Sequence, residues 1–188
     1  DRVFFQIMAQ LALLCGILQR DIRFDHRDLK ADNIFIRNKP VQYSVSFGTK
    51  LYTLECPFQL VIMDFGFACL GNIKGITQVN LAKDILPPLD PCPKIGRDIF
   101  QCVASFWTIS TLRDKMSMET QAEVDSWFIS GKRDYSKFIK KFSDIKWIYV
   151  LTADPDFQHM LLDIDTLLAR ISFLYPTLLH VSEILETN

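Results

Sequence analysis

Apolar residues recur every three or four positions near the start of the chain, at Phe4, Met8, Leu11, Leu14 and Leu18. This spacing is typical of a helix, and we expect one over residues 3–19. Most other positions of the stretch are also apolar, which predicts a helix that is buried on most of its sides.

The pattern then changes to one that is typical of strands. Apolar and polar residues alternate over residues 41–54, and the alternation breaks around Gly48, which predicts a hairpin turn. Shorter apolar runs at 33–37 and 59–63 predict two more strands. This part of the chain should therefore form short β hairpins.

Residues 66–97 are rich in glycine and proline and predict a long irregular segment, which in compact domains is usually functional or mobile. From Asp98 the helical pattern returns, and we expect further helices over 119–142 and 157–186, the last one interrupted at Pro176. The predicted fold class is α+β, mainly α.

The composition is that of a soluble globular domain, with 188 residues, 49% of them apolar and 23% charged. A net charge of −1 argues against a non-specific binder of nucleic acid or of anionic membranes, so we expect no direct nucleic-acid partner. The apolar run Leu11–Leu18 is far shorter than a membrane span, so we also expect no membrane partner.

The five cysteines are scattered and form no CxxC pair. Such a set predicts free, mostly buried thiols in a reduced intracellular protein, in the nucleus or the cytoplasm.

Two motifs carry the candidate chemistry. Residues 26–33 read His-Arg-Asp-Leu-Lys-Ala-Asp-Asn, and residues 64–66 read Asp-Phe-Gly directly after a predicted strand. In this order, and with a helix before the first motif, they resemble the catalytic loop and the metal motif of eukaryotic-type Ser/Thr protein kinases. Small-molecule phosphotransferases share that lobe architecture, but usually lack the Arg and the Phe-Gly pair.

The resemblance implies a protein-kinase-like fold in which residues 1–188 form the C-terminal lobe. It also assigns chemical roles. Asp28 would accept the proton of the attacking hydroxyl, and Lys30 would steady the transferring phosphate of ATP. Asn33 and Asp64 would bind Mg²⁺ and ATP, since both offer the oxygen ligands that Mg²⁺ prefers. Lys30 is also the residue that marks Ser/Thr specificity in this family.

Five other residues have structural or regulatory roles by the same resemblance. His26 should hydrogen-bond backbone around the second motif, and Arg27 should reach the activation segment. Phe65 should pack beneath a helix of the N-terminal lobe, and Gly66 should adopt dihedral angles that are closed to other residues. Asp98 either bonds the backbone of the catalytic loop or is a plain helix N-cap.

The activation segment would span about residues 64–97, with Thr77 either phosphorylated and paired with Arg27 or simply an unmodified loop residue. Lys83, Lys94 and Arg97 are either a solvated face or contacts for an acidic substrate.

Two departures from common kinases resemble the haspin group. Asn33 and Asp64 are separated by 30 residues, which leaves room for a hairpin insertion at about 38–58, and no Ala-Pro-Glu motif precedes Asp98. An acidic residue also stands directly before His26, as in haspins. The resemblance to haspins makes a histone tail a candidate substrate. The retained Phe-Gly pair and Lys30 count against a haspin, and the rival is a divergent Ser/Thr kinase of ordinary ancestry, of cellular or viral origin.

The predicted function is transfer of the ATP γ-phosphate to Ser or Thr of a protein substrate. No Gly-rich loop precedes the motifs and the sequence does not begin with Met. We therefore expect an N-terminal lobe in cis, upstream of these residues. We also expect residues 1–188 to be inactive on their own. The alternative is a catalytically silent kinase-fold binding module.

Overall fold

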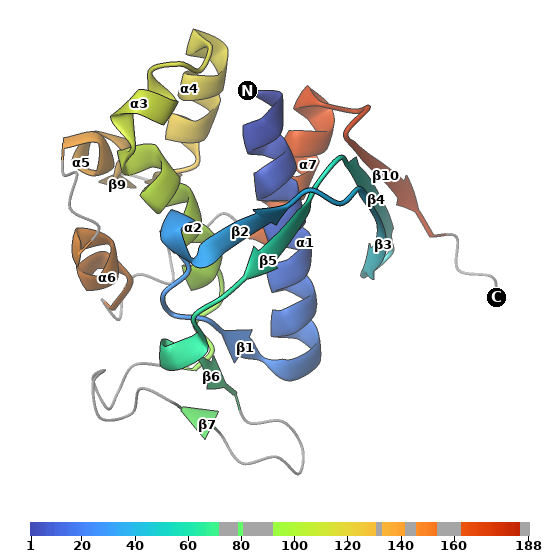
Figure 1. Cartoon of the computed structure of the whole chain (residues 1–188), viewed down its shortest axis with the longest axis horizontal. Helices are drawn as coiled ribbons and strands as arrows, with labels where there is room; N and C mark the ends of the chain where they lie inside the picture. Colours follow the sequence, from blue (N-terminus) through green and yellow to red (C-terminus); the bar gives the residue numbers. More distant parts are fainter. Residues whose placement is uncertain (72–78, 81–91, 131–132, 142–145, 154–162, 185–188) are drawn as a thin grey trace.

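The computed structural model describes residues 1–71, 79–80, 92–130, 133–141, 146–153 and 163–184. Within these residues the fold is a mixture of helices and small antiparallel sheets, which confirms the predicted α+β class. Figure 1 shows helix α1 (Arg2–Ile22) running through the middle of the fold, with α2 on one side and a three-stranded sheet on the other.

Helix α1 is longer than the sequence pattern predicted and supplies much of the core. It ends at Arg23, which adopts a left-handed conformation with φ 49° and ψ 44°. By length and composition alone α1 could cross a membrane, whereas the shorter apolar run Leu11–Leu18 led us to expect no segment long enough to do so. However, 67% of its most apolar window is buried inside the protein, as in the core helix of a globular domain.

Strands β2 (Ile34–Arg37) and β5 (Gln59–Ile62) pair in an antiparallel ladder, as predicted. Gln10 of α1 is bonded to the backbone of the β5 segment. Its Nε2 donates to the carbonyl of Phe58 at 3.1 Å, and its Oε1 accepts the N–H of Leu60 at 3.1 Å. A helix side chain thus supplies hydrogen bonds that a neighbouring strand would otherwise provide.

The predicted hairpin is present as β3 (Val41–Phe47) and β4 (Lys50–Cys56). The third strand of this sheet was not predicted. Strand β10 (Leu179–Glu183) pairs antiparallel with β4, in a stretch where the sequence pattern indicated a helix. The preceding helix α7 (Ile164–Leu174) ends two residues before Pro176.

The remaining helices are α2 (Arg97–Thr108), α3 (Ser110–Arg113), α4 (Met118–Ser126), α5 (Ser136–Lys141) and α6 (Lys146–Ala153). The helix expected over 119–142 is broken after α4. There Trp127 and Phe128 are buried, and the short strands β8 (Ile129–Ser130) and β9 (Arg133–Asp134) form a hairpin. Burial of these two aromatic rings outweighs continuation of the helix.

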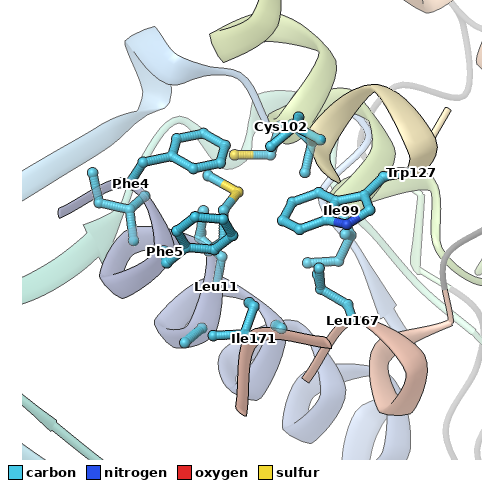
Figure 2. Close-up of a cluster of buried hydrophobic side chains, with 14 of the residues drawn as sticks. Phe4, Phe5, Leu11, Ile99, Cys102, Trp127, Leu167 and Ile171 are labelled. Atoms are coloured by element: carbon cyan, nitrogen blue, oxygen red, sulfur yellow. The ribbon is translucent and has the colours of Figure 1, made fainter. Parts of the chain in front are cut away.

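The core lies between α1, α2 and α7. Figure 2 shows its labelled members, Phe4, Phe5, Leu11, Ile99, Cys102, Trp127, Leu167 and Ile171. Burying apolar side chains of this size supplies the main favourable free energy of folding. This packed unit is the platform on which the loop between α1 and β2 is held.

A small sheet lies at the end of α1, formed by β1 (Phe24–Asp25), β6 (Cys69–Leu70) and β7 (Val79–Asn80). Cys69 of β6 forms a disulfide with Cys92, so the prediction of free thiols is wrong for these two residues. The thiols of Cys15, Cys56 and Cys102 are free and buried, as expected. Burial raises the pKa of Cys15 and Cys102, so neither is activated as a thiolate.

Candidate active site

Asp28 lies in the loop between β1 and β2, and its carboxylate is the centre of the site. Lys30 Nζ donates to both Asp28 carboxylate oxygens, at 3.2 and 3.1 Å. Asn33 Nδ2, in the 3-10 turn η1 (Ala31–Asn33), donates to Asp28 Oδ2 at 3.1 Å and to the Asp28 carbonyl at 2.8 Å. The structure therefore brings the three predicted catalytic residues together.

Asp64 is placed beside this group by the β2–β5 ladder. The N–H of Met63 donates to the carbonyl of Asn33 at 3.0 Å, which extends the ladder by one rung to the residue before Asp64. Asp64 is exposed and has a left-handed backbone, with φ 63° and ψ 70°. Two motifs that are 30 residues apart in the sequence are thus neighbours in space.

Gly66 does not have the conformation that the sequence led us to expect. It lies in the 3-10 turn η2 (Phe65–Phe67) and is not among the residues with positive φ, whereas Asp64 is. A Cβ at position 66 would lie 3.5 Å from Asp64 Oδ1, which is ordinary contact. The unusual backbone of this motif is therefore at the aspartate and not at the glycine.

His26 links the two motifs. Its Nε2–H donates to the Met63 carbonyl at 2.9 Å, as expected for this residue, and its Nδ1 accepts the N–H of Asp28 at 3.4 Å. Burial lowers the pKa of His26, although the Met63 carbonyl and the nearby Asp28 and Asp64 carboxylates oppose this shift. The imidazole is therefore neutral at pH 7, with its proton on Nε2.

The backbone of the catalytic loop is anchored by Asp98 of α2. Asp98 Oδ2 accepts the N–H of His26 at 2.8 Å, and Oδ1 accepts the N–H of Arg27 at 3.0 Å. The N-cap of α2 is Gly96, at φ 79°, so the alternative of a plain N-cap at Asp98 does not hold. Arg27 is buried and has φ 67°, a strained value that these bonds help to hold.

A buried charged cluster beside this anchor was not predicted. Asp25 is fully buried, accepts the N–H of Lys94 at 3.0 Å and lies 3.5 Å from Arg97 Nε. Burial and the Asp98 charge raise the pKa of Asp25 well above its ordinary value, despite Arg97. Lys94 and Arg97 are each 3% exposed, so neither is on a solvated face or available to a substrate.

Phe65 is 45% exposed and packs against His26, with ring centroids 5.2 Å apart, and against Phe24, at 6.0 Å. Phe35, Ile36 and Met63 of the neighbouring ladder are also exposed. By the register of the ladder, Phe35 and Met63 lie on one face and Ile36 on the other, so Phe35 and Met63 are the pair that can form an exposed apolar face.

Asp64 and Asn33 could together hold a divalent metal ion. Asn33 points its Nδ2 at Asp28, so its amide oxygen stays an acceptor, and the Asp64 carboxylate is solvent-accessible. No group of three or more His, Cys, Asp or Glu side chains that could form a closed metal site is found in the described part of the chain. Two oxygen donors suit Mg²⁺, which usually keeps several waters and binds substrate phosphates.

Thr77 and Lys83 lie outside the described residues, as does most of the predicted activation segment. The structure also adds a residue that the sequence did not reveal. The Tyr149 hydroxyl of α6 donates to Asp28 Oδ1, and Lys30 Nζ lies 6.0 Å from the centroid of its ring. No motif marks Tyr149, because the contact joins residues that are 121 positions apart.

Comparison with known proteins gives two matches. Residues 2–85, which contain both motifs, match the family model of the poxvirus serine/threonine protein kinase. Probable kinase 098L of Invertebrate iridescent virus 3 is 33% identical over 100 residues, which cover 52% of this chain and 18% of that protein. The chain thus aligns with less than a fifth of this relative. Together, the two matches and the site geometry support a kinase-like family for this chain.

Proposed function

We propose that the protein transfers the γ-phosphoryl group of ATP to a Ser or Thr hydroxyl of a protein substrate, with this chain as the C-terminal lobe of a kinase-like fold. The observation that carries the proposal is the Asp28 carboxylate, held by Lys30 and Asn33 in a loop beside Asp64. The two viral kinase matches support it.

In the proposed reaction the substrate oxygen attacks the γ-phosphorus, its proton passes to Asp28, and the bond to the bridging oxygen breaks so that ADP leaves. Such transfers depend mainly on positioning and on charge stabilisation. Lys30 offers a positive charge next to Asp28, where it can steady the transferring group. Asn33 and Asp64 would hold Mg²⁺, which when bound neutralises phosphate charge.

The proposal includes an N-terminal lobe that grips the ATP phosphates. The exposed apolar residues Phe35 and Met63, on one face of the β2–β5 ladder, and the exposed Phe65 favour such a neighbour. Residues 1–188 alone should then transfer phosphate poorly, whereas the full-length protein should be active. This comparison needs only the two proteins and one assay.

The substrate class is a narrower proposal. Both matches are to viral kinases, which favours the viral Ser/Thr kinase over the haspin-like alternative. Phosphorylation of a histone-tail peptide in preference to a generic basic protein would favour the haspin-like alternative instead. Phosphoamino-acid analysis of the product tests the expected Ser/Thr specificity in either case.

The decisive experiment is phosphate incorporation by the full-length protein and its Asp28→Asn variant. We expect the variant to lose about a thousandfold in kcat, the range typical of general-base catalysis. Asp114→Asn is the matched control, because the Asp114 side chain is 66% exposed and lies beside Arg113, away from the site. It should retain full activity.

Equal incorporation by the parent and Asp28→Asn would show that Asp28 is not the base. If the parent binds ATP but transfers no phosphate to any protein or peptide, the alternative of a silent kinase-fold binding module is favoured.

A further inference from the structure

The contact between Tyr149 and Asp28 joins the candidate base to a helix from a distant part of the chain. The Tyr149 hydroxyl donates to Asp28 Oδ1, and the Tyr149 ring lies below the Lys30 ammonium, 6.0 Å from its centroid. The catalytic loop and α6 therefore meet at the carboxylate that a substrate hydroxyl would have to reach.

The hydrogen bonds to Asp28 leave no room for another donor. A carboxylate offers about four acceptor sites on its two oxygens. Lys30 Nζ donates to both oxygens, Asn33 Nδ2 donates to Oδ2, and Tyr149 donates to Oδ1. The Asp28 side chain is also only 7% exposed. An incoming alcohol would find neither a free lone pair nor an open path.

Of the three donors, Tyr149 is the one that comes from outside the catalytic loop, so it can leave together with its own helix. Lys30 and Asn33 belong to the same loop as Asp28, and Asn33 is also bonded to the Asp28 carbonyl at 2.8 Å. Tyr149 comes from α6, and its hydroxyl is an alcohol bonded to the base, as the acceptor of a kinase reaction must be.

Helix α6 is held in this position from its far end. The Thr152 carbonyl accepts from Lys94 Nζ at 2.8 Å, and Thr152 Oγ1 accepts from Gln101 Nε2 at 2.9 Å. Ile148, the residue before Tyr149, is 3% exposed. The Tyr149–Asp28 contact is thus part of a packed arrangement between α2 and α6.

We propose that Tyr149 is an internal occupant of the acceptor site, so that α6 has to move away from Asp28 before a substrate hydroxyl can bind. The proposal rests on the proposed function, because it takes Asp28 as the base. It adds an autoinhibitory contact within the same lobe. The substrate competes with Tyr149 for one carboxylate oxygen.

The kinetic test compares full-length protein with its Tyr149→Phe variant, which keeps the ring and removes the hydroxyl. We expect the KM for a Ser-containing acceptor peptide to fall about tenfold, the size of effect typical of a charge-assisted hydrogen bond. The kcat and the KM for ATP should not change. Tyr135→Phe is the matched control, because Tyr135 is also half-buried but packs on the core away from Asp28.

An unchanged or higher peptide KM in Tyr149→Phe, or a lower kcat, would overturn the proposal, since Tyr149 would then be neutral or would assist the reaction.

A second measurement needs no catalysis. Hydrogen exchange of the α6 amides should become about tenfold faster than in the parent in Tyr149→Phe and in Asp28→Ala. In the double variant it should be no faster than in either single variant. Additive effects would show that the two side chains are not coupled, and the proposal would fall. If the coupling is present but the parent transfers no phosphate, the proposed function fails, and the acceptor-site interpretation fails with it.

Discussion

Asp98 Oδ2 accepts the backbone N–H of His26 at 2.8 Å, although the two residues are 72 positions apart in the sequence. The other oxygen of the same carboxylate accepts the N–H of Arg27 at 3.0 Å. One side chain of α2 thus fixes two consecutive peptide groups immediately before Asp28. This explains how a loop with a left-handed Arg27 keeps one conformation.

Replacing Asp98 by Ala would leave two buried N–H groups without an acceptor. We expect a loss of about 2 to 4 kcal/mol in the free energy of unfolding, since each unsatisfied buried donor costs about 1 to 3 kcal/mol. Urea denaturation measures the loss. Asp114→Ala, at an exposed position, should change stability by less than about 0.5 kcal/mol. A loss below about 1 kcal/mol in Asp98→Ala would mean that the anchor contributes little.

The raised pKa of Asp25 predicts how the free energy of unfolding depends on pH. The folded state binds this proton more tightly than the unfolded state, whose pKa is near the ordinary 3.8. This proton's contribution to the free energy of unfolding is fully present below the unfolded-state pKa. It is lost as pH rises through the raised pKa of the folded state. In Asp25→Asn the side-chain carbonyl can still accept from the Lys94 N–H, and position 25 no longer titrates.

The free energy of unfolding of Asp25→Asn, relative to the parent, should therefore increase from pH 5 to pH 8. Urea denaturation at several pH values measures this difference. His26 and Asp98 remain in the variant, but both interact with Asp25, so the difference between the two proteins also includes the change in their titration. A difference that does not vary with pH would contradict a neutral Asp25 in the folded state.

The disulfide between Cys69 and Cys92 makes a prediction about thiol chemistry. Alkylation in denaturant without reductant should label Cys15, Cys56 and Cys102, and peptide mapping should recover Cys69 linked to Cys92. Closing a loop of 23 residues stabilises the folded state by about 3 kcal/mol in the chain-entropy account. Cys69→Ser should therefore lower stability by about that amount without reductant and by much less with it. Labelling of all five cysteines would rule the bond out.

Gly16 of α1 lies against the hairpin. A Cβ at this position would be 2.6 Å from Cζ of Phe47, whose ring also packs against Tyr52. We expect Gly16→Ala to destabilise the protein by about 1 to 3 kcal/mol, because overpacking here exceeds the gain in helix propensity. Gly16→Ala combined with Phe47→Leu should recover part of the loss, and thermal denaturation can compare the variants. An equal or higher Tm in Gly16→Ala alone would show that the ring moves freely.

Local patterns predicted the elements that are determined by their own residues. The periodicity of α1 and the alternation around Gly48 were sufficient, because each reflects burial of one face of a single element. The site motifs could be found for a similar reason, since Asp28, Lys30 and Asn33 are close in sequence. The contact of Asp98 with the loop was expected only through the resemblance to kinases.

The features that sequence reasoning missed depend on distant partners. Strand β10 forms because β4 offers it an edge, and its own apolar pattern fits a helix as well. The Cys69–Cys92 bond and the Tyr149–Asp28 contact have no local pattern at all. The buried Asp25 was also missed, because a charged residue is expected at the surface unless its partners are known.

The two hydrogen bonds of Gln10 to the β5 segment have a mechanical consequence. They connect the first helix to the strand that leads directly into Asp64. The same helix continues through Arg23 and β1 into the Asp28 loop. Helix α1 is therefore attached to both carboxylates, to Asp28 through the chain itself and to Asp64 through Gln10, so a shift of the helix would carry the two together.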